Sequence, residues 1–141
     1  MYRDLIHTPD QALVHLAVHC CLKDGDLQSE ELDFMATTFV AKGLNKNLNL
    51  KDEMLHYQSY HLAIKDETAY LSFLFDTIKP YNKLALFAFC AEIIYRNGRV
   101  SLSEEVLLEK IASLLYVKEN ENIVIQQLIT ELNDVEQRNA F

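Results

Sequence analysis

A short phrase that occurs twice constrains this chain more than any other feature of its sequence. One copy covers residues 24–31 and the other covers residues 97–104, and an apolar run precedes each. In both copies a glycine, Gly25 or Gly98, is followed two residues later by an aliphatic residue and six residues later by a glutamate. Glycine reaches positive φ without steric penalty, so each phrase is typical of a tight turn between two helices. The internal similarity therefore predicts two helix-turn-helix units built on one plan.

The composition favours a single helical domain. The chain has 141 residues, of which 50% are hydrophobic, and this is enough for one domain with a substantial core. It contains only three glycines and two prolines, whereas β-rich or disordered chains need more turn residues. We therefore expect an all-α bundle that occupies residues 1–141 as one domain.

About seven helices are expected from apolar periodicity and from capping residues. The expected helices cover residues 8–23, 29–42, 49–62, 66–79, 82–96, 103–116 and 119–137. The stretch 82–96 is nearly all apolar, so we expect it to form the central helix of the bundle. The last helix is expected to bury five apolar side chains: Ile125, Leu128, Ile129, Leu132 and Val135.

The charge and the apolar runs exclude several classes of protein. A net charge of −8 disfavours nucleic acid as a partner, because phosphate binding needs a basic surface. The most apolar stretch, residues 84–94, includes Glu92 and is too short to span a bilayer. No basic segment followed by an apolar one opens the chain, so we expect no secretory signal. Three cysteines in helical patterns suggest reduced thiols, and hence a cytoplasmic protein that is not embedded in a membrane.

The first turn gathers carboxylates. Asp24, Asp26, Glu30 and Glu31 fall within eight residues, and such crowding costs repulsion unless the side chains spread into solvent or share a hard cation. Capping offers a purely structural alternative. A glutamate in the first turn of a helix suits the helix dipole, and Ser101 to Glu104 reads as a Ser-x-x-Glu capping box.

A calcium EF-hand does not explain the repeated phrase. Its glycine and final glutamate match the end of an EF-hand loop. The first and third ligand positions would then be Cys20 and Leu22 in one copy, and Ile93 and Tyr95 in the other. These residues cannot supply the oxygen ligands that calcium needs, so the EF-hand interpretation fails.

Residues 17–31 and 91–104 resemble the repeated units of the tellurite-resistance TerB-like family, in which an apolar helix is followed by Asp-Gly-x-aliphatic and a glutamate. The resemblance implies an all-α bundle of about seven helices with an acidic surface, a divalent-metal site and a role among stress-response proteins. Its acidic positions would be Asp24 and Glu31 in the first unit and Glu104 in the second. Asn97 stands where the second unit should have an aspartate, which makes a symmetric two-metal site unexpected.

The histidines offer a different candidate site. His15 and His19 lie four residues apart, which places two imidazoles on one face of a helix, as zinc sites often do. The stripe continues through Gln11 and Lys23, so we expect it to be the solvated edge of the helix. Three tyrosines are expected at the rim between the core and solvent: Tyr57, Tyr60 and Tyr70.

Three functional hypotheses follow. The first is a non-catalytic TerB-like protein with protein partners and a weak divalent-metal site of unknown metal at Asp24, Asp26 and Glu31, to which Glu104 contributes. The second is an acidic protein-interaction module without metal, which docks a basic partner. The third is a small metal-dependent enzyme that uses His15 and His19 with Asp24. The sequence offers this enzyme no activated nucleophile and no Gly-rich phosphate loop, so we expect a protein that is not an enzyme.

Overall fold

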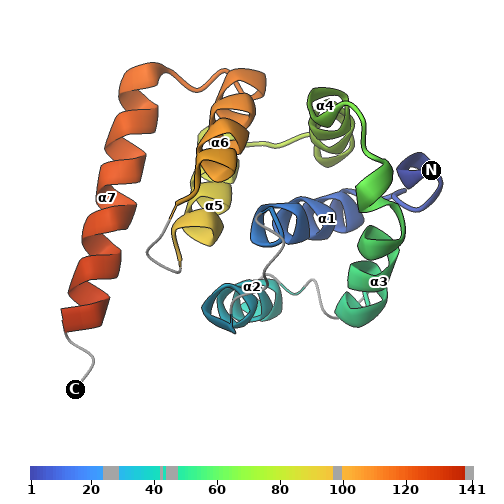
Figure 1. Ribbon diagram of the computed structural model, residues 1–141, viewed down its shortest axis with the longest axis horizontal. Helices are drawn as coiled ribbons and strands as arrows, with labels where there is room; N and C mark the ends of the chain where they lie inside the picture. The colour runs from blue at the N-terminus through green and yellow to red at the C-terminus, as the bar shows by residue number, and fades with distance from the viewer. Residues whose placement is uncertain (24–28, 42, 44–47, 97–99, 139–141) are drawn as a thin grey trace.

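The computed structural model describes residues 1–23, 29–41, 43, 48–96 and 100–138, without the side chains of residues 29–32 and 136–138. The described residues are all-helical and contain no strand, which confirms the predicted fold class (Figure 1). Short 3₁₀ turns at Tyr2–Asp4 and His61–Ala63 accompany seven α-helices. The helices are α1 (Pro9–Cys21), α2 (Ser29–Ala41), α3 (Leu50–Tyr60), α4 (Glu67–Ile78), α5 (Lys83–Tyr95), α6 (Leu102–Leu114) and α7 (Glu119–Arg138).

Local capping residues fix where five of these helices begin. Each cap side chain accepts a hydrogen bond from the backbone N–H group three residues later; the caps are Thr8, Asn49, Asp66, Asn82 and Ser101. Such a bond satisfies one of the otherwise unpaired N–H groups of the first turn and stabilises the protein by about 1 kcal/mol. The helix starts are therefore encoded locally.

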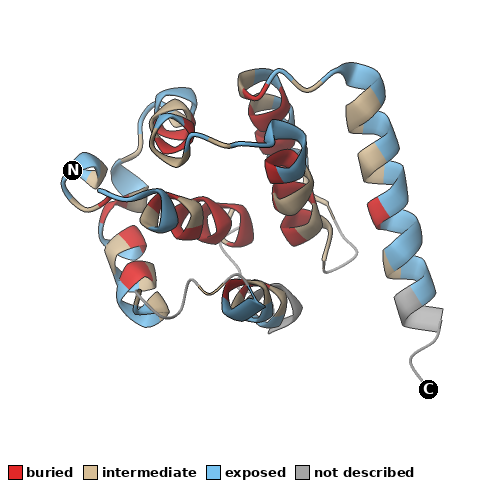
Figure 2. Ribbon diagram, turned by 180° about the vertical axis from the view of Figure 1, so that it is seen from behind, coloured by how far each residue is buried: buried red, intermediate tan, exposed pale blue. Residues whose placement is uncertain are grey.

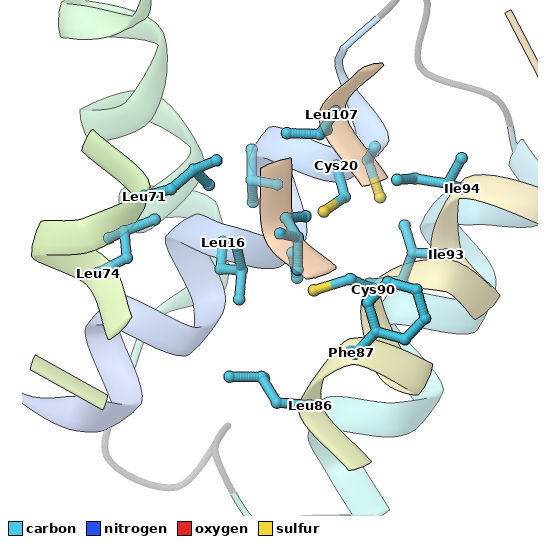
Figure 3. Packing of buried hydrophobic residues seen from close by; sticks show 14 of the residues in the cluster. Leu16, Cys20, Leu71, Leu74, Leu86, Phe87, Cys90, Ile93, Ile94 and Leu107 are labelled. Carbon is cyan, nitrogen blue, oxygen red and sulfur yellow. The ribbon is translucent and has the colours of Figure 1, made fainter. Parts of the chain in front are cut away.

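Two helices share the centre of the bundle, so the prediction of a single central helix was incomplete. Helix α5 packs against α1, α2, α6 and α7, whereas α1 packs against α2, α3, α4 and α5 (Figure 1). Leu16 and Cys20 on α1 lie in one cluster with Phe87 and Cys90 on α5 and Leu107 on α6 (Figure 3). Each of these side chains is 0% exposed, and full burial of one Leu or Phe stabilises the fold by about 1.5–3 kcal/mol.

Helix α7 lies at the edge of the bundle, where its main contact is with α5 (Figures 1 and 2). Ile129 is buried and Ile125 is half-buried, as expected. The predicted burial of the other three side chains was wrong, because Leu128, Leu132 and Val135 are 50–61% exposed. The periodic pattern correctly identified an apolar face, but the packing of α7 on α5 covers only part of that face.

The repeated phrase connects α1 with α2 and α5 with α6. Residues 24–28 and 97–99, where the two turns are predicted, lie outside the described residues, so the predicted pseudo-repeat stays a prediction. In the part of the chain that the structure describes, every helix is too short or too polar to cross a membrane.

Candidate functional sites

The predicted metal site falls largely on residues that the structure does not describe. Asp24 and Asp26 lie outside the described residues, and so does the side chain of Glu31, although its backbone belongs to α2. Glu104 is described and is only 2% exposed. Among the described residues, no group of three or more histidine, cysteine, aspartate and glutamate side chains could hold a metal ion.

Glu104 forms the predicted capping box. Its Oε1 accepts a hydrogen bond from the backbone N–H of Ser101 at 3.0 Å, and Ser101 Oγ accepts one from the backbone N–H of Glu104 at 3.1 Å. This reciprocal pair satisfies two N–H groups at the start of α6. The burial and position of Glu104 are thus explained by helix capping, while any contribution to a metal site stays a prediction.

The structure overturns the prediction of a solvated histidine stripe. His15 is 0% exposed and His19 is 6% exposed, because α3 and α4 cover this side of α1. The three tyrosines predicted at the rim are also buried, each at 3% exposure or less: Tyr57, Tyr60 and Tyr70. These five side chains, together with Glu53 and Glu67, form a polar network inside the protein, which we call the histidine network.

His15 connects α1 to α3 through both of its ring nitrogens. Nε2 lies 2.8 Å from Glu53 Oε1, and Nδ1 lies 2.7 Å from the hydroxyl of Tyr60. A carboxylate only accepts hydrogen bonds, so Nε2–H donates to Glu53 and Nδ1 of the neutral ring accepts from Tyr60. Tyr60 and Tyr70 place their hydroxyl oxygens 2.5 Å apart, which extends the chain of hydrogen bonds to α4.

His19 repeats this arrangement with different partners. Its Nδ1 lies 2.8 Å from the hydroxyl of Tyr57 on α3, and its Nε2 lies 2.8 Å from Glu67 Oε2 on α4. Each of the two histidines is therefore held between one tyrosine and one glutamate. Because both ring nitrogens are engaged in both residues, a zinc ion could bind here only by displacing an existing hydrogen-bond partner.

Glu67 joins three helices through its carboxylate. Oε2 accepts from His19 and lies 2.5 Å from Lys23 Nζ, which follows α1, while Oε1 lies 2.9 Å from Lys110 Nζ on α6. The hydrogen bond from His19 is the largest cause that holds the pKa of Glu67 well below its usual range, and the two lysines act in the same direction. Partial burial acts in the opposite direction and raises the pKa of Glu67, but its effect is smaller than that of the three donors together.

Burial favours the neutral form of one histidine and three tyrosines in the histidine network: His15, Tyr57, Tyr60 and Tyr70. Desolvation lowers the pKa of His15 despite the hydrogen bond to Glu53, which favours the neutral imidazole. Desolvation also raises the pKa values of Tyr57, Tyr60 and Tyr70 above the ordinary range of tyrosine. The network is consequently a hydrogen-bonded connection among α1, α3 and α4 rather than a set of groups open to solvent.

A signal for the histidine network was present in the sequence. Glu53, Tyr57 and Tyr60 are spaced four and three residues apart, which puts them on one face of α3. That face could supply partners to the polar stripe of α1. The sequence pattern identified the stripe, but it did not reveal that another polar helix face covers it.

A second candidate site lies on α7. Four apolar side chains on one flank of the helix are about half exposed: Val124, Leu128, Leu132 and Val135. The described residues 119–135 contain four acidic residues and no lysine or arginine. This flank, which we call the α7 face, is therefore an apolar strip on an acidic helix.

Comparison with known proteins identifies no relative. No protein-family model, no curated protein and no solved structure matches this chain. The similarity to TerB-like proteins accordingly stays a hypothesis, and the function has to be argued from the residues of this chain.

Proposed function

We propose that this protein is a non-catalytic interaction module that docks a basic amphipathic helix of a partner protein on the α7 face. The exposed apolar strip carries the proposal, because contiguous apolar surface bordered by polar residues is typical of interaction sites. The proposal selects the second of the three functional hypotheses and adds the surface at which the partner binds.

The spacing of the strip suits a helical ligand. Val124, Leu128, Leu132 and Val135 recur at intervals of four, four and three residues, so they align along one side of α7. The first and the last lie eleven positions apart, which corresponds to about 16 Å along a helix. A partner helix of about three turns would cover this length with apolar side chains of its own at the same spacing.

The charge of α7 favours a basic partner helix over a second copy of this chain as the ligand of the α7 face. Glu119, Glu121, Glu131 and Asp134 lie among the described residues of this helix, and the whole chain has a net charge of −8. Pairing of α7 with α7 of a second copy would bring like charges together, which disfavours self-association through this face. A helix with lysine or arginine beside its apolar residues would gain both attraction and faster encounter.

The histidine network supports a non-catalytic role. The remaining enzymatic hypothesis needs His15 and His19 to bind a metal with Asp24, yet both ring nitrogens of both histidines already have protein partners. The network joins α1, α3 and α4 by hydrogen bonds and thereby stabilises the bundle that carries α7. A divalent-metal site at the first turn stays a separate prediction, because Asp24 and Asp26 lie outside the described residues.

A designed peptide tests the proposal. We would measure the fluorescence anisotropy of a labelled Leu/Lys amphipathic peptide of about fourteen residues as the full chain is added. We expect micromolar binding, which Leu128→Asn should weaken about tenfold through loss of apolar contact. Leu62→Asn is the matched control, because Leu62 is 89% exposed outside the α7 face.

Three outcomes would contradict the proposal. Equal weakening by Leu62→Asn would mean that the peptide binds any exposed apolar residue. Equal binding of a Leu/Glu peptide with the same apolar spacing would remove the charge argument. A dimer in light scattering that Leu128→Asn dissociates would show that a second copy occupies the α7 face.

A further inference from the structure

A groove of about 620 Å³ lies where the ends of α4 and α6 meet the start of α5. Buried Phe75 and Leu115 contribute to its apolar lining. Lys79, Lys83 and Tyr116 line it as well, and all three are exposed. The volume falls in the range of sites that hold small organic molecules, and the groove is separate from both the α7 face and the histidine network.

The two lysines of the groove carry charge that the protein itself does not neutralise. Among the described residues, neither Lys79 nor Lys83 forms an ion pair, even though the chain as a whole is strongly acidic and Asp76 lines the same groove. Lys83 Nζ instead lies 4.9 Å from the ring centroid of Tyr116. The groove therefore combines two cations with an exposed aromatic ring.

The backbone at the groove is strained at two positions. Lys79 ends α4 with φ 51°, and Tyr116 follows α6 with φ 57°. Glycine is the usual residue in this left-handed conformation after a helix, because other residues meet a steric penalty there. Among the described residues, Lys79 and Tyr116 are the only ones other than glycine with positive φ, and both line this groove. Strained residues of this kind cluster at sites of ligand binding.

We propose that the groove binds a small organic anion that carries a flat ring. The anionic group, a phosphate monoester or a carboxylate, interacts with the ammonium groups of Lys79 and Lys83. The ring packs against Tyr116 above the apolar lining. The strain at Lys79 and Tyr116 is then maintained because it places these two side chains at the ligand.

Phenyl phosphate and benzoate are suitable probes, with inorganic phosphate and benzyl alcohol as probes that lack either the ring or the charge. We would titrate each into the isotope-labelled full chain and follow amide chemical shifts. The expected result is saturable shifts at Lys79, Lys83 and Tyr116 with at least one aromatic anion, and weaker binding of the two incomplete probes.

Glycine substitutions separate ligand binding from folding. Lys79→Gly and Tyr116→Gly each remove a groove side chain and relieve the strained φ, so the variants should stay folded, as unchanged amide spectra elsewhere would verify. Each should weaken binding of the aromatic anion about fivefold, which corresponds to the loss of one charge contact or one aromatic contact at a surface. Lys51→Gln removes an exposed lysine from α3 and should leave binding unchanged.

The proposal is overturned if neither aromatic anion saturates the shifts, or if both glycine variants bind like the parent. Inorganic phosphate binding as tightly as phenyl phosphate would refute the role of the ring. Equal weakening by Lys51→Gln would reduce the effect to the overall charge of the protein.

Discussion

Nε2 of His19 lies 2.8 Å from Oε2 of Glu67, and this hydrogen bond joins α1 to α4 inside the bundle. The same carboxylate also accepts hydrogen bonds from the ammonium groups of Lys23 and Lys110. The carboxylate of Glu67 on α4 thus binds three donors, two from α1 and the segment that follows it and one from α6. The stability of the bundle should therefore depend on the charge of Glu67.

We predict that Glu67→Gln lowers the free energy of unfolding by about 2–4 kcal/mol at pH 7. The substitution keeps the shape of the side chain but leaves Lys23 and Lys110 without their carboxylate, and removal of one partner from such a network is costly. Urea unfolding of both proteins measures the change. Glu109→Gln, on the exposed surface of α6, should alter the value by less than about 0.5 kcal/mol.

The effect of Glu67 should depend on pH in a defined direction. Its pKa is lower in the folded than in the unfolded protein, so its charge stabilises the fold above the unfolded pKa of about 4.3. This stabilisation is lost as the pH falls toward the depressed folded value. The difference in stability between the parent and Glu67→Gln should therefore shrink progressively below about pH 4. A difference that stays constant down to pH 2 would contradict the assigned role.

His15 should produce a second pH dependence in a separate range. Burial lowers its pKa in the folded protein, so the unfolded chain binds a proton first as the pH falls through about 6.5. The parent should lose stability between pH 7 and pH 5, at up to about 1.4 kcal/mol per pH unit from this residue. His15→Gln should show a smaller loss over the same interval. Chemical denaturation at several pH values compares the two proteins, and identical slopes would show that His15 does not titrate in this way.

Tyr60→Phe tests the continuity of the histidine network. The hydroxyl of Tyr60 lies between Nδ1 of His15 and the hydroxyl of Tyr70, so its removal leaves two buried polar groups without this partner. We expect a loss of about 1–3 kcal/mol in the free energy of unfolding. Tyr81→Phe is the control, because Tyr81 is fully exposed and should tolerate the loss of its hydroxyl. Equal stability of Tyr60→Phe and the parent would indicate that water replaces the hydroxyl.

Helix class and helix starts could be predicted from the sequence because their signals are local. Asn49, Asp66 and Asn82 each act within their own first turn, so no knowledge of the rest of the fold is needed. The burial of His15 and His19 could not be predicted in this way. A polar stripe on a helix can face solvent, or it can form hydrogen bonds with another helix. Here α3 and α4 pack on α1 and bury its polar stripe, and the sequence of α1 alone does not contain this information. The exposure of Leu128 and Leu132 has the same origin, because an apolar face predicts contact without specifying how many helices cover it.

Metal binding, if the TerB-like resemblance holds, should be asymmetric and belong to the first turn. Asp24, Asp26 and Glu31 offer three carboxylates there, whereas Glu104 of the second unit is already used as a helix cap. Hard divalent cations need several oxygen ligands, so binding should raise the melting temperature of the parent in a panel of Ca²⁺, Mg²⁺, Mn²⁺ and Zn²⁺. Asp24→Asn should abolish this increase, while Asn97→Asp should leave it equal or larger. An equal increase in Asp24→Asn would assign the carboxylates to capping and solvation, and the interaction-module hypothesis would then lead.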